Sequence, residues 1–556
     1  MTGSILGIWW VVTNSWYDMV KSVDLMDNKW VPRYVESEPK PEALFNMISG
    51  WLADCVNNHT RCRQNATALP HMVLDLESKD PVVVFGHSRE ERYAALTHCW
   101  GQKPPLQTKT TNLFSRMAAI PFSELPKTFQ DAVVVTRRLG LRYLWIDSLC
   151  IIQDDLEDWK VESAKMMAYY RDAYITISAL SSSDSHQGML GHRTPAKQLL
   201  LSARSQLHIR RKTPQFWSMF DGEPLNARAW TFQERLLSTR IIHIGKKELL
   251  WECNTCSARE AGLTNLRTGS IGDDNIPPKI GNFGVDPKLS DPSLAALQLV
   301  KVPDIDTIMT LDFKRLIIEA AAKNIDTLKV WKHLVTEFMK RKITRNSDRL
   351  PAIGGLAKTL FEGAKFTYLA GILKERPYGL LWDVGDKHGL FRDWEHHDLV
   401  NTVSTQLDAP SWSWAAARNP IFFQKSMGHS FRVENDAEIM DSDIKCIGPD
   451  MFGQVSSGWI RLSAHICVSD VKADGRNRTP KPYYWRSWNS PSDVKPQERL
   501  FIGIRSWEDT YGNIKITCIQ VVPDPKEANA YKRVGHLVEF VAQYGNFGKK
   551  SSIILI

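Results

Sequence analysis

Residues 144–155, which read LWIDSLCIIQDD, decide the fold class of this chain. The stretch starts with bulky apolar residues, carries a carboxylate at Asp147, and ends in an acidic loop before a helix predicted over about residues 158–172. An apolar strand, polar groups at its carboxyl end and a helix returning behind it are typical of a parallel α/β sheet. We therefore predict a strand at residues 144–152 and a site near its carboxyl end.

The neighbouring residues repeat this alternation of strand and helix. Residues 93–100 predict a strand that ends at Gly101, where a small residue allows a tight exit. Pro126 opens a predicted helix that Gly140 closes, and residues 174–178 predict a further strand. Strand and helix in this order, with short connections, form the βαβ pattern of a parallel sheet.

Further segments surround this α/β region. The sequence predicts a helix at residues 42–57, two strands at 71–76 and 82–85, and a β-hairpin with strands at 240–244 and 248–252. A chain of 556 residues is longer than one hydrophobic core usually supports, so we expect several parts. They are a lead-in at 1–90 (a helix plus short strands), an α/β domain at 91–260, a loop or linker at 261–310, a helical segment at 311–402 and a β-rich module at 403–556.

The composition restricts the class of protein. With 43% hydrophobic and 24% charged residues the chain is an ordinary globular protein, and its net charge of +8 is mild for its length. It shows no basic stripe, so we predict no nucleic-acid binding. Nine cysteines, sparse and odd in number, favour a reducing compartment. We predict a cytoplasmic protein without a transmembrane segment, because the apolar run at residues 5–12 is too short for one and fits a strand or a surface anchor.

A set of motifs occurs along the chain in a fixed order. They are YAALTHCWG (93–101), LPKTFQDA (125–132), LWIDSLCIIQDD (144–155), Asp158-Trp159 with Glu162 and Met166, and RAWTFQERLL (228–237). The flanking matches are Trp51, Cys55, His59, Cys62, Leu69 and Pro70 before them, and SDRLPAI (347–353) and APSWSWA (409–415) after them. On these motifs the chain resembles the fungal heterokaryon incompatibility (HET) domain proteins over most of residues 51–416, and the α/β domain is the part that resembles the HET domain itself.

This resemblance implies a fold and a function. The HET domain is similar to TIR domains, which implies a TIR-like (flavodoxin-like) parallel sheet with flanking helices. Proteins of this family are associated with non-self recognition after hyphal fusion and with regulated cell death, which implies a signalling or effector module that self-associates or binds a protein partner. Some TIR domains cleave the nicotinamide–ribose bond, which implies as an alternative an NAD hydrolase with NAD as its substrate. A further alternative is an accessory protein of a metabolic gene cluster.

The resemblance also implies site residues. Glu162 is the predicted catalytic residue, because Trp159 and Glu162 repeat the Trp-x-x-Glu start of the TIR helix that bears the catalytic glutamate. The alternative is that Glu162 has no catalytic role and is an acidic residue in the first turn of its helix, where the positive end of the helix dipole stabilises its negative charge. The predicted ligand-binding residues are Asp147, Trp100 and Gly101. Asp147 could contact a ribose hydroxyl or cap a loop, and Trp100 could border a base-stacking surface or belong to a core.

Other acidic residues have plainer roles. Asp154 and Asp155 fit turn or capping positions, and Glu234 with Arg235 fits an ion pair that holds its segment. The chain has no phosphate-binding glycine loop, nucleophile elbow or zinc-protease motif, so the usual hydrolase and kinase functions have no support in the sequence.

The predicted site contains no metal and no bound cofactor. Two half-motifs nevertheless leave a zinc site open, namely Cys55, His59 and Cys62 at one place and Cys253 and Cys256 at another. Together they offer four thiols and an imidazole. The alternative is that His59 terminates a helix and that Cys253 ends a hairpin strand.

Overall fold

The computed structural model consists of two compact units, residues 1–326 and 327–556, which we describe separately. The described residues are 17–21, 34–87, 89–202, 207–211, 216–262, 264–266, 312–322, 326–384, 408–417, 419–423, 436–470, 498–508, 514–527, 529–541 and 550–556. The apolar run at 5–12 and most of the predicted linker at 261–310 lie outside them. Among the described helices, none combines the length and the apolar character that crossing a bilayer requires.

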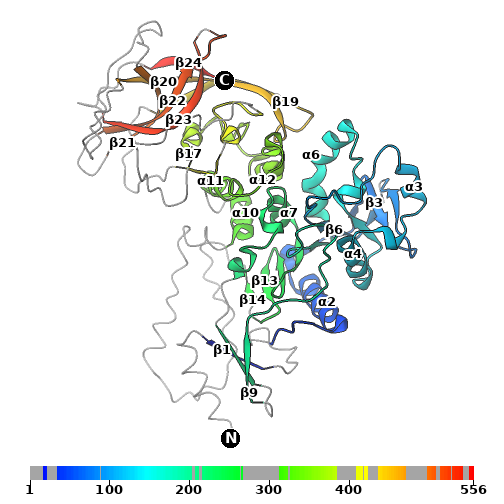
Figure 1. Ribbon diagram of the computed structural model, residues 1–556. Helices are drawn as coiled ribbons and strands as arrows, with labels where there is room; N and C mark the ends of the chain where they lie inside the picture. Colours follow the sequence, from blue (N-terminus) through cyan, green and yellow to red (C-terminus); the bar gives the residue numbers. More distant parts are fainter. Residues whose placement is uncertain are drawn as a thin grey trace, which may run out of the picture. The chain divides into compact units, whose positions relative to one another are not determined.

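The first unit is built on a nine-stranded sheet (Figure 1). From one edge to the other, its strands are β14 (Thr264–Leu266), β13 (Cys256–Arg259), β12 (Leu249–Cys253), β11 (Arg240–Ile244), β8 (Ile175–Ser178), β6 (Tyr93–Thr97), β7 (Tyr143–Trp145), β3 (Met72–Asp75) and β4 (Val82–Phe85). The four central strands, β11, β8, β6 and β7, are parallel to one another. All the other neighbours in the sheet are antiparallel.

This mixed sheet corrects the prediction of a parallel one. The strand pairs predicted around residues 71–85 and 240–252 do form hairpins, β3–β4 and β11–β12. Each hairpin joins one side of the parallel core, since Leu74 of β3 pairs with Leu144 of β7 and β11 pairs with β8. Consecutive strands joined by a short turn run antiparallel, so their addition makes the sheet mixed.

Two helices connect the parallel strands, α4 (Lys127–Arg138) between β6 and β7, and α6 (Leu156–Asp172) between β7 and β8. Because β7 and β8 lie on opposite sides of β6 and such crossovers are right-handed, α4 and α6 cover opposite faces of the sheet (Figure 1). On α6, Tyr169 and Tyr170 pack against Trp145, with ring centroids 5.3 and 5.5 Å apart. This packing buries the end of β7, from which the site is built.

The predicted strand at residues 144–152 is wrong after Trp145. β7 has only three residues, and the chain then forms the short helix α5 (Asp147–Cys150). A short apolar run in the sequence fits a buried strand and a buried helix equally well. Here the run is apolar because Leu149 and Cys150 are fully buried in the helix α5. Asp147 therefore stands at the first position of α5, directly beyond the carboxyl end of β7.

The predicted lead-in helix is α2 (Pro41–Asn58), with proline at its first position as helices favour. Its buried residues recur at three- and four-residue spacing: Leu44, Phe45, Ile48, Leu52 and Cys55. Trp51 packs against Trp251 of β12, with ring centroids 6.4 Å apart. The helix ends at His59, as one of the sequence alternatives predicted, and a single 3-10 turn, η1 (Thr60–Cys62), follows it.

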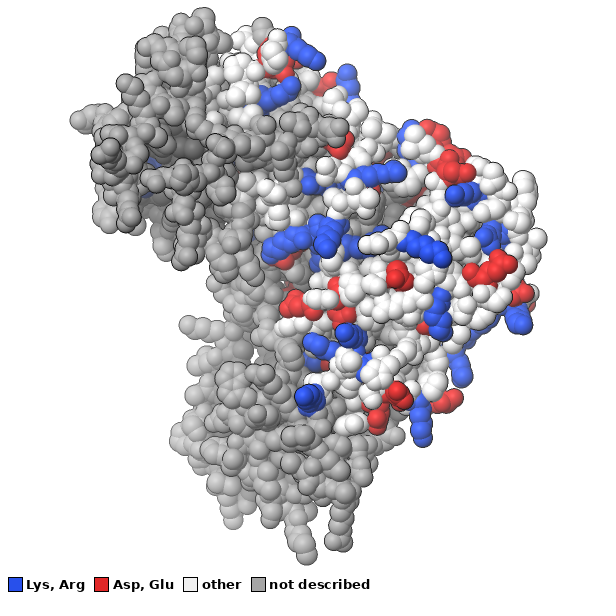
Figure 2. All heavy atoms as spheres, viewed as in Figure 1, with Lys and Arg blue, Asp and Glu red and all other residues white. Residues whose placement is uncertain are grey.

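The remaining elements of the first unit are smaller. They are α3 (Leu113–Ala118), η2 (Phe122–Glu124), η3 (Phe216–Phe220), η4 (Leu225–Ala227), α7 (Thr231–Leu237), α10 (Phe313–Ala321), the sheet of β1 (Tyr17–Lys21), β10 (Leu207–Arg211) and β9 (Gln198–Ser202), and the pair β2 (Thr67–Ala68) and β5 (Glu90–Glu91). α7 lies beside α6. On the face of this unit seen in Figure 2, basic and acidic side chains are interspersed.

The second unit combines a small helical part with the β-rich module that the sequence predicts. It contains α11 (Thr327–Phe338), η6 (Asn346–Asp348), α12 (Pro351–Phe361), β15 (Tyr368–Leu369), β16 (Ile372–Leu373), η7 (Pro377–Leu380), β17 (Trp382–Val384), η8 (Trp414–Ala416), β18 (Ile421–Phe423), β19 (Glu438–Cys446), β20 (Val455–Asp470), β21 (Glu498–Glu508), β22 (Ile514–Pro523), β23 (Ala530–Val541) and β24 (Ser551–Leu555). The strands β19 to β24 form one sheet, in which β24 pairs with both β23 and β20 and so closes a ring. The indoles of Trp331 and Trp414 both donate to the carbonyl oxygen of Gly371, at 2.8 and 2.9 Å.

Candidate functional site

Polar groups gather at the carboxyl ends of β6 and β7. The indole Nε1 of Trp100 donates to Asp147 Oδ2 at 2.9 Å, and the backbone N–H of Ser148 donates to Asp147 Oδ1 at 2.7 Å. His98 Nδ1 lies 3.8 Å from the same Oδ1. Two of the predicted ligand-binding residues, Trp100 and Asp147, are thus in direct contact.

The strand order explains why these groups meet here. The chain passes from β6 to β7 on one side and then back past β6 to β8 on the other side. In open α/β sheets a ligand-binding crevice forms where the order reverses, outside the carboxyl ends of the strands. His98 and Trp100 follow β6 at this point, and Asp147 follows the neighbouring β7.

Two residues of the RAWTFQERLL motif complete this group. The guanidinium of Arg228 donates to the carbonyl oxygen of His98. Glu234 on α7 is buried, and this burial raises its pKa to about 7, with Arg228 and Asp147 near enough to influence it. We call His98, Trp100, Asp147, Arg228 and Glu234 the strand-end cluster. It holds a carboxyl group that titrates near neutral pH, beside a partly exposed carboxylate and a cation.

One ring nitrogen of His98, in the strand-end cluster, is buried without a hydrogen bond to any described residue. The residue is 3% exposed, and its Nε2 has no hydrogen-bond partner among the described residues. The ring stands edge-on to Phe129 of α4, with centroids 4.9 Å apart. A buried polar atom without a partner is costly, and such atoms often mark a functional position.

We expect His98 to make the first unit sensitive to acid. Burial lowers the pKa of His98 to about 4, whereas an exposed histidine titrates near 6.5. As the pH falls below about 6.5, His98 becomes protonated in the unfolded chain but stays neutral in the folded chain. The folded state therefore loses stability as the pH falls towards about 4. This group should lower the free energy of unfolding by about 1 kcal/mol per pH unit in that window. Urea unfolding at several pH values gives the free energy of unfolding as a function of pH. Between about pH 6.5 and 4 this free energy should fall less steeply for His98→Gln than for the unchanged chain, and an equal pH dependence would contradict this account.

At Gly101, beside the strand-end cluster, the backbone conformation and a close neighbour leave no room for a side chain. Its φ is +80°, and a Cβ built on it would lie 2.3 Å from the Cβ of Asp184. Asp184 belongs to the loop that follows β8, and its Oδ1 accepts the backbone N–H groups of His186 and Gln187 at 2.7 and 2.9 Å. The glycine lets the two loops beyond β6 and β8 approach each other.

Gly101→Ala should therefore destabilise the first unit by about 2 kcal/mol, from the left-handed backbone and the clash together. Gly140 is a matched control, because its φ is +73° but a Cβ there would have no atom within 4 Å. We expect Gly140→Ala to cost only about 1 kcal/mol, from the backbone alone. Chemical denaturation of both variants measures the difference, and equal losses would mean that the Asp184 contact is unimportant.

Glu162, the predicted catalytic residue, lies on α6 and is bonded within its own helix. Its side chain is 1% exposed. Its Oε2 accepts from the hydroxyl of Tyr169 at 2.6 Å, and its Oε1 accepts from Lys165 Nζ at 2.9 Å. Among the described contacts, none joins Glu162 to Trp100 or Asp147. This arrangement resembles a packing role more than a substrate-binding one.

Of the two other acidic residues, Asp155 has the capping role predicted for it, whereas Asp154 binds a distant segment at Thr110. Asp155 caps α6 and accepts the N–H groups of Glu157 and Asp158 at 2.9 and 3.1 Å. Asp154 accepts from the backbone and the hydroxyl of Thr110, at 2.8 and 3.0 Å.

One buried network was not predicted. Arg235 forms an ion pair with Glu252 at 2.6 Å, and not the predicted pair with Glu234. Glu252 also bonds His243 Nε2 at 3.0 Å, and His243 Nδ1 bonds the hydroxyl of Ser178 at 2.9 Å. These residues alternate along their strands with apolar ones, and that weak pattern is the only sequence signal for them. The network fastens α7 to the sheet.

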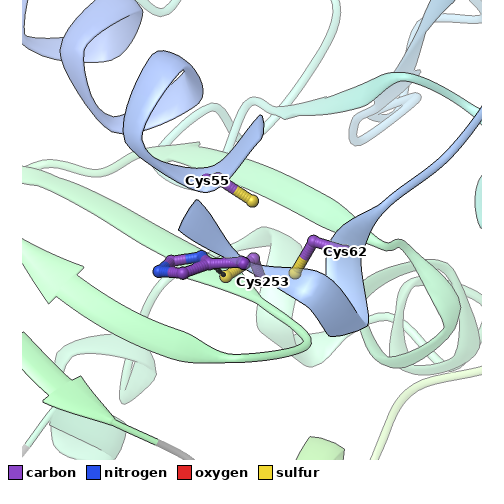
Figure 3. A group of neighbouring side chains, drawn as sticks. Cys55, Cys62 and Cys253 are labelled. Atoms are coloured by element: carbon purple, nitrogen blue, oxygen red, sulfur yellow. Dashed lines mark hydrogen bonds between the residues drawn. The ribbon is translucent and has the colours of Figure 1, made fainter. Parts of the chain in front are cut away.

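The two cysteine half-motifs converge at a separate place in the first unit. Cys55, His59, Cys62 and Cys253, which we call the thiol–imidazole cluster, are all buried, and their ligand atoms lie within 4.8 Å of one another. Figure 3 shows the sulfur atoms of its three cysteines directed towards a common point, from the last turn of α2, from η1 and from the end of β12. Hydrogen bonds lower the pKa of Cys253, and the bond from Cys256 has the largest effect. A hydrogen bond with Cys253 raises the pKa of His59 to about 9. These residues could hold a metal ion.

Comparison with known proteins identifies one family. Residues 93–234 match the family described as heterokaryon incompatibility protein (HET). No curated protein and no solved structure matches the chain. The matched range begins at the first residue of β6, ends at Glu234, and contains all five residues of the strand-end cluster. The chain is therefore a protein with a HET domain at residues 93–234, the family that its sequence motifs predicted.

Proposed function

We propose that this chain is an effector of fungal non-self recognition and regulated cell death, and that its HET domain acts through the strand-end cluster. The supporting observation is that Trp100 and Asp147, which both lie within the matched range, are hydrogen-bonded to each other where the strand order reverses. Asp147 keeps 19% of its side chain exposed there, so a ligand or a protein partner can reach it. On this proposal the chain acts in the cytoplasm and works with a protein partner or with a second copy of itself.

The alternative function is NAD hydrolysis of the TIR kind. Its support is the order of the parallel strands, since β7, β6, β8 and β11 are the second, first, third and fourth of these strands along the chain. Flavodoxin-like folds have the same order and bind nucleotides at the reversal. The contacts of Glu162 give this alternative no support, because a buried carboxylate bonded to Tyr169 and Lys165 is not free to meet a substrate. A nucleotide reaction, if this chain performs one, would need Asp147 or Glu234 instead.

Inducible expression of the full chain in a fungal host tests both functions. We expect arrest of hyphal growth, with cellular NAD unchanged during the first hours if the chain is a signalling module. Loss of NAD before growth stops would favour the hydrolase. Normal growth at high expression, also after fusion with strains of other incompatibility types, would contradict the proposed role in cell death.

A further inference from the structure

We propose that the thiol–imidazole cluster holds a structural zinc ion, which fastens the segment preceding the HET domain to the domain's sheet. The inference does not depend on the proposed function. It rests on the distances between the donor atoms, on the groups around them and on their burial.

The distances fit tetrahedral coordination. With zinc–sulfur bonds near 2.3 Å and zinc–nitrogen bonds near 2.0 Å, a tetrahedral site separates sulfur from nitrogen by about 3.5 Å and sulfur from sulfur by about 3.8 Å. Cys253 Sγ lies 3.4 Å from His59 Nδ1. All four donor atoms fall within 4.8 Å of one another, so small side-chain movements would complete the tetrahedron.

The surroundings resemble those of bound metal ligands. The backbone N–H of Cys256 donates to Cys253 Sγ at 3.3 Å, a bond that stabilises a thiolate. His59 turns Nδ1 towards the sulfur atoms and Nε2 towards Asp54, whose Oδ2 lies 3.9 Å away. Asn58 holds the other oxygen of Asp54 at 2.8 Å. A carboxylate behind a ligating histidine is the usual way to orient its ring.

Burial and ligand type together indicate a structural zinc. Cys55, Cys62 and Cys253 are 0% exposed and His59 is 9% exposed, so four protein ligands surround the centre and none of them faces open solvent. Catalytic zinc sites keep one position open for water or substrate, whereas structural ones are closed by four protein ligands. Three soft thiolates and one imidazole suit zinc better than calcium or magnesium, which prefer oxygen.

The ion would join parts of the chain that are far apart in the sequence. His59 and Cys253 are separated by 194 positions, and the ligands come from α2, from the turn after it and from the last residue of β12. A cross-link across so long a loop removes much conformational freedom from the unfolded chain. It would also hold α2 where Trp51 packs against Trp251.

The metal content of the full-length protein tests the inference. Protein purified under reducing conditions, without chelators, should contain about one zinc ion per chain by elemental analysis, as structural sites do. Cys62→Ser should lose most of it. Cys150→Ser is the matched control, because Cys150 is equally buried in the same core but outside the cluster, and its zinc content should not change.

A second measurement guards against variants that fail to fold. Unsubstituted protein stripped of metal and titrated with Co²⁺ should show thiolate-to-cobalt charge-transfer absorption and strong d–d bands, saturating at about one equivalent. Absence of bound zinc together with absence of these bands, in folded and fully reduced protein, would overturn the inference. So would a Cys62→Ser variant that keeps its zinc. A disulfide between Cys55 and Cys253 in protein isolated with its native redox state would also overturn it, because those sulfurs could then not bind the ion.

Discussion

Asp147→Asn should abolish most of the growth arrest that the chain causes, with at least a tenfold loss of potency at equal expression. Asparagine keeps the shape of the side chain but removes its charge, and it can present only one oxygen where Asp147 now accepts from both Trp100 and Ser148. Hydrogen bonds to a charged acceptor contribute about 1.5–3 kcal/mol, which corresponds to roughly tenfold to a hundredfold in binding. The dose of inducer needed to halve hyphal growth is the measurement.

The control for this experiment is Asp154→Asn. Asp154 is an exposed carboxylate seven positions further along the chain, and it accepts hydrogen bonds from Thr110, which is outside the strand-end cluster. It should leave potency within about twofold, as surface changes usually do. If both variants were as potent as the unchanged chain while remaining folded by circular dichroism, the strand-end cluster would not be the functional site.

Glu162→Ala should lower the free energy of unfolding of the first unit by about 3 kcal/mol. The change leaves a cavity beneath α6 and deprives the hydroxyl of Tyr169 of its acceptor. Tyr169 in turn packs on Trp145 and accepts the backbone N–H of His71 at 3.3 Å, so the loss spreads from the helix to the sheet. Lys165 is 46% exposed and can turn to water, so its contribution is small.

Glu162→Gln separates this structural role from a catalytic one. Glutamine still offers an oxygen to Tyr169, so we expect only about 1 kcal/mol of lost stability and nearly full potency in the growth assay. A catalytic carboxylate would show the reverse, with stability kept and activity lost. Glu157→Ala is the matched control on the same helix, because the Glu157 side chain is 79% exposed, and it should change stability by less than about 0.5 kcal/mol.

Local sequence patterns predicted most of the elements of the first unit. The spacing of the apolar residues and Pro41 place α2 within a residue of its observed bounds, and the β3–β4 and β11–β12 hairpins are where short strands flank turn residues. These signals are local, because a helix face or a hairpin turn is determined by residues close together in the chain. The contact between Trp100 and Asp147 was predictable for the same reason, since each follows a strand of one βαβ unit.

Features that depend on distant contacts were not predictable. No local pattern says that the hairpin at β11–β12 joins the same sheet as β8, so the mixed character of the sheet stayed hidden. The Trp-x-x-Glu resemblance places Glu162 on a helix, but only the packing of α6 shows which way its side chain points. The convergence of Cys62 with Cys253 likewise depends on how α2 lies against β12.

The closed ring of the second unit bears on how copies of this chain could associate. Strands as long as β22 and β23, with 10 and 12 residues, would invite edge-to-edge pairing with other chains if their backbone groups were unpaired. β22 has a neighbour on each side over most of its length, whereas β23 pairs with β24 only at Ala530 and Tyr531, and β19 pairs with β20 alone. Among the described strands of this sheet, another chain could therefore add a strand, as in amyloid, only beside β19 or beside the part of β23 beyond Tyr531.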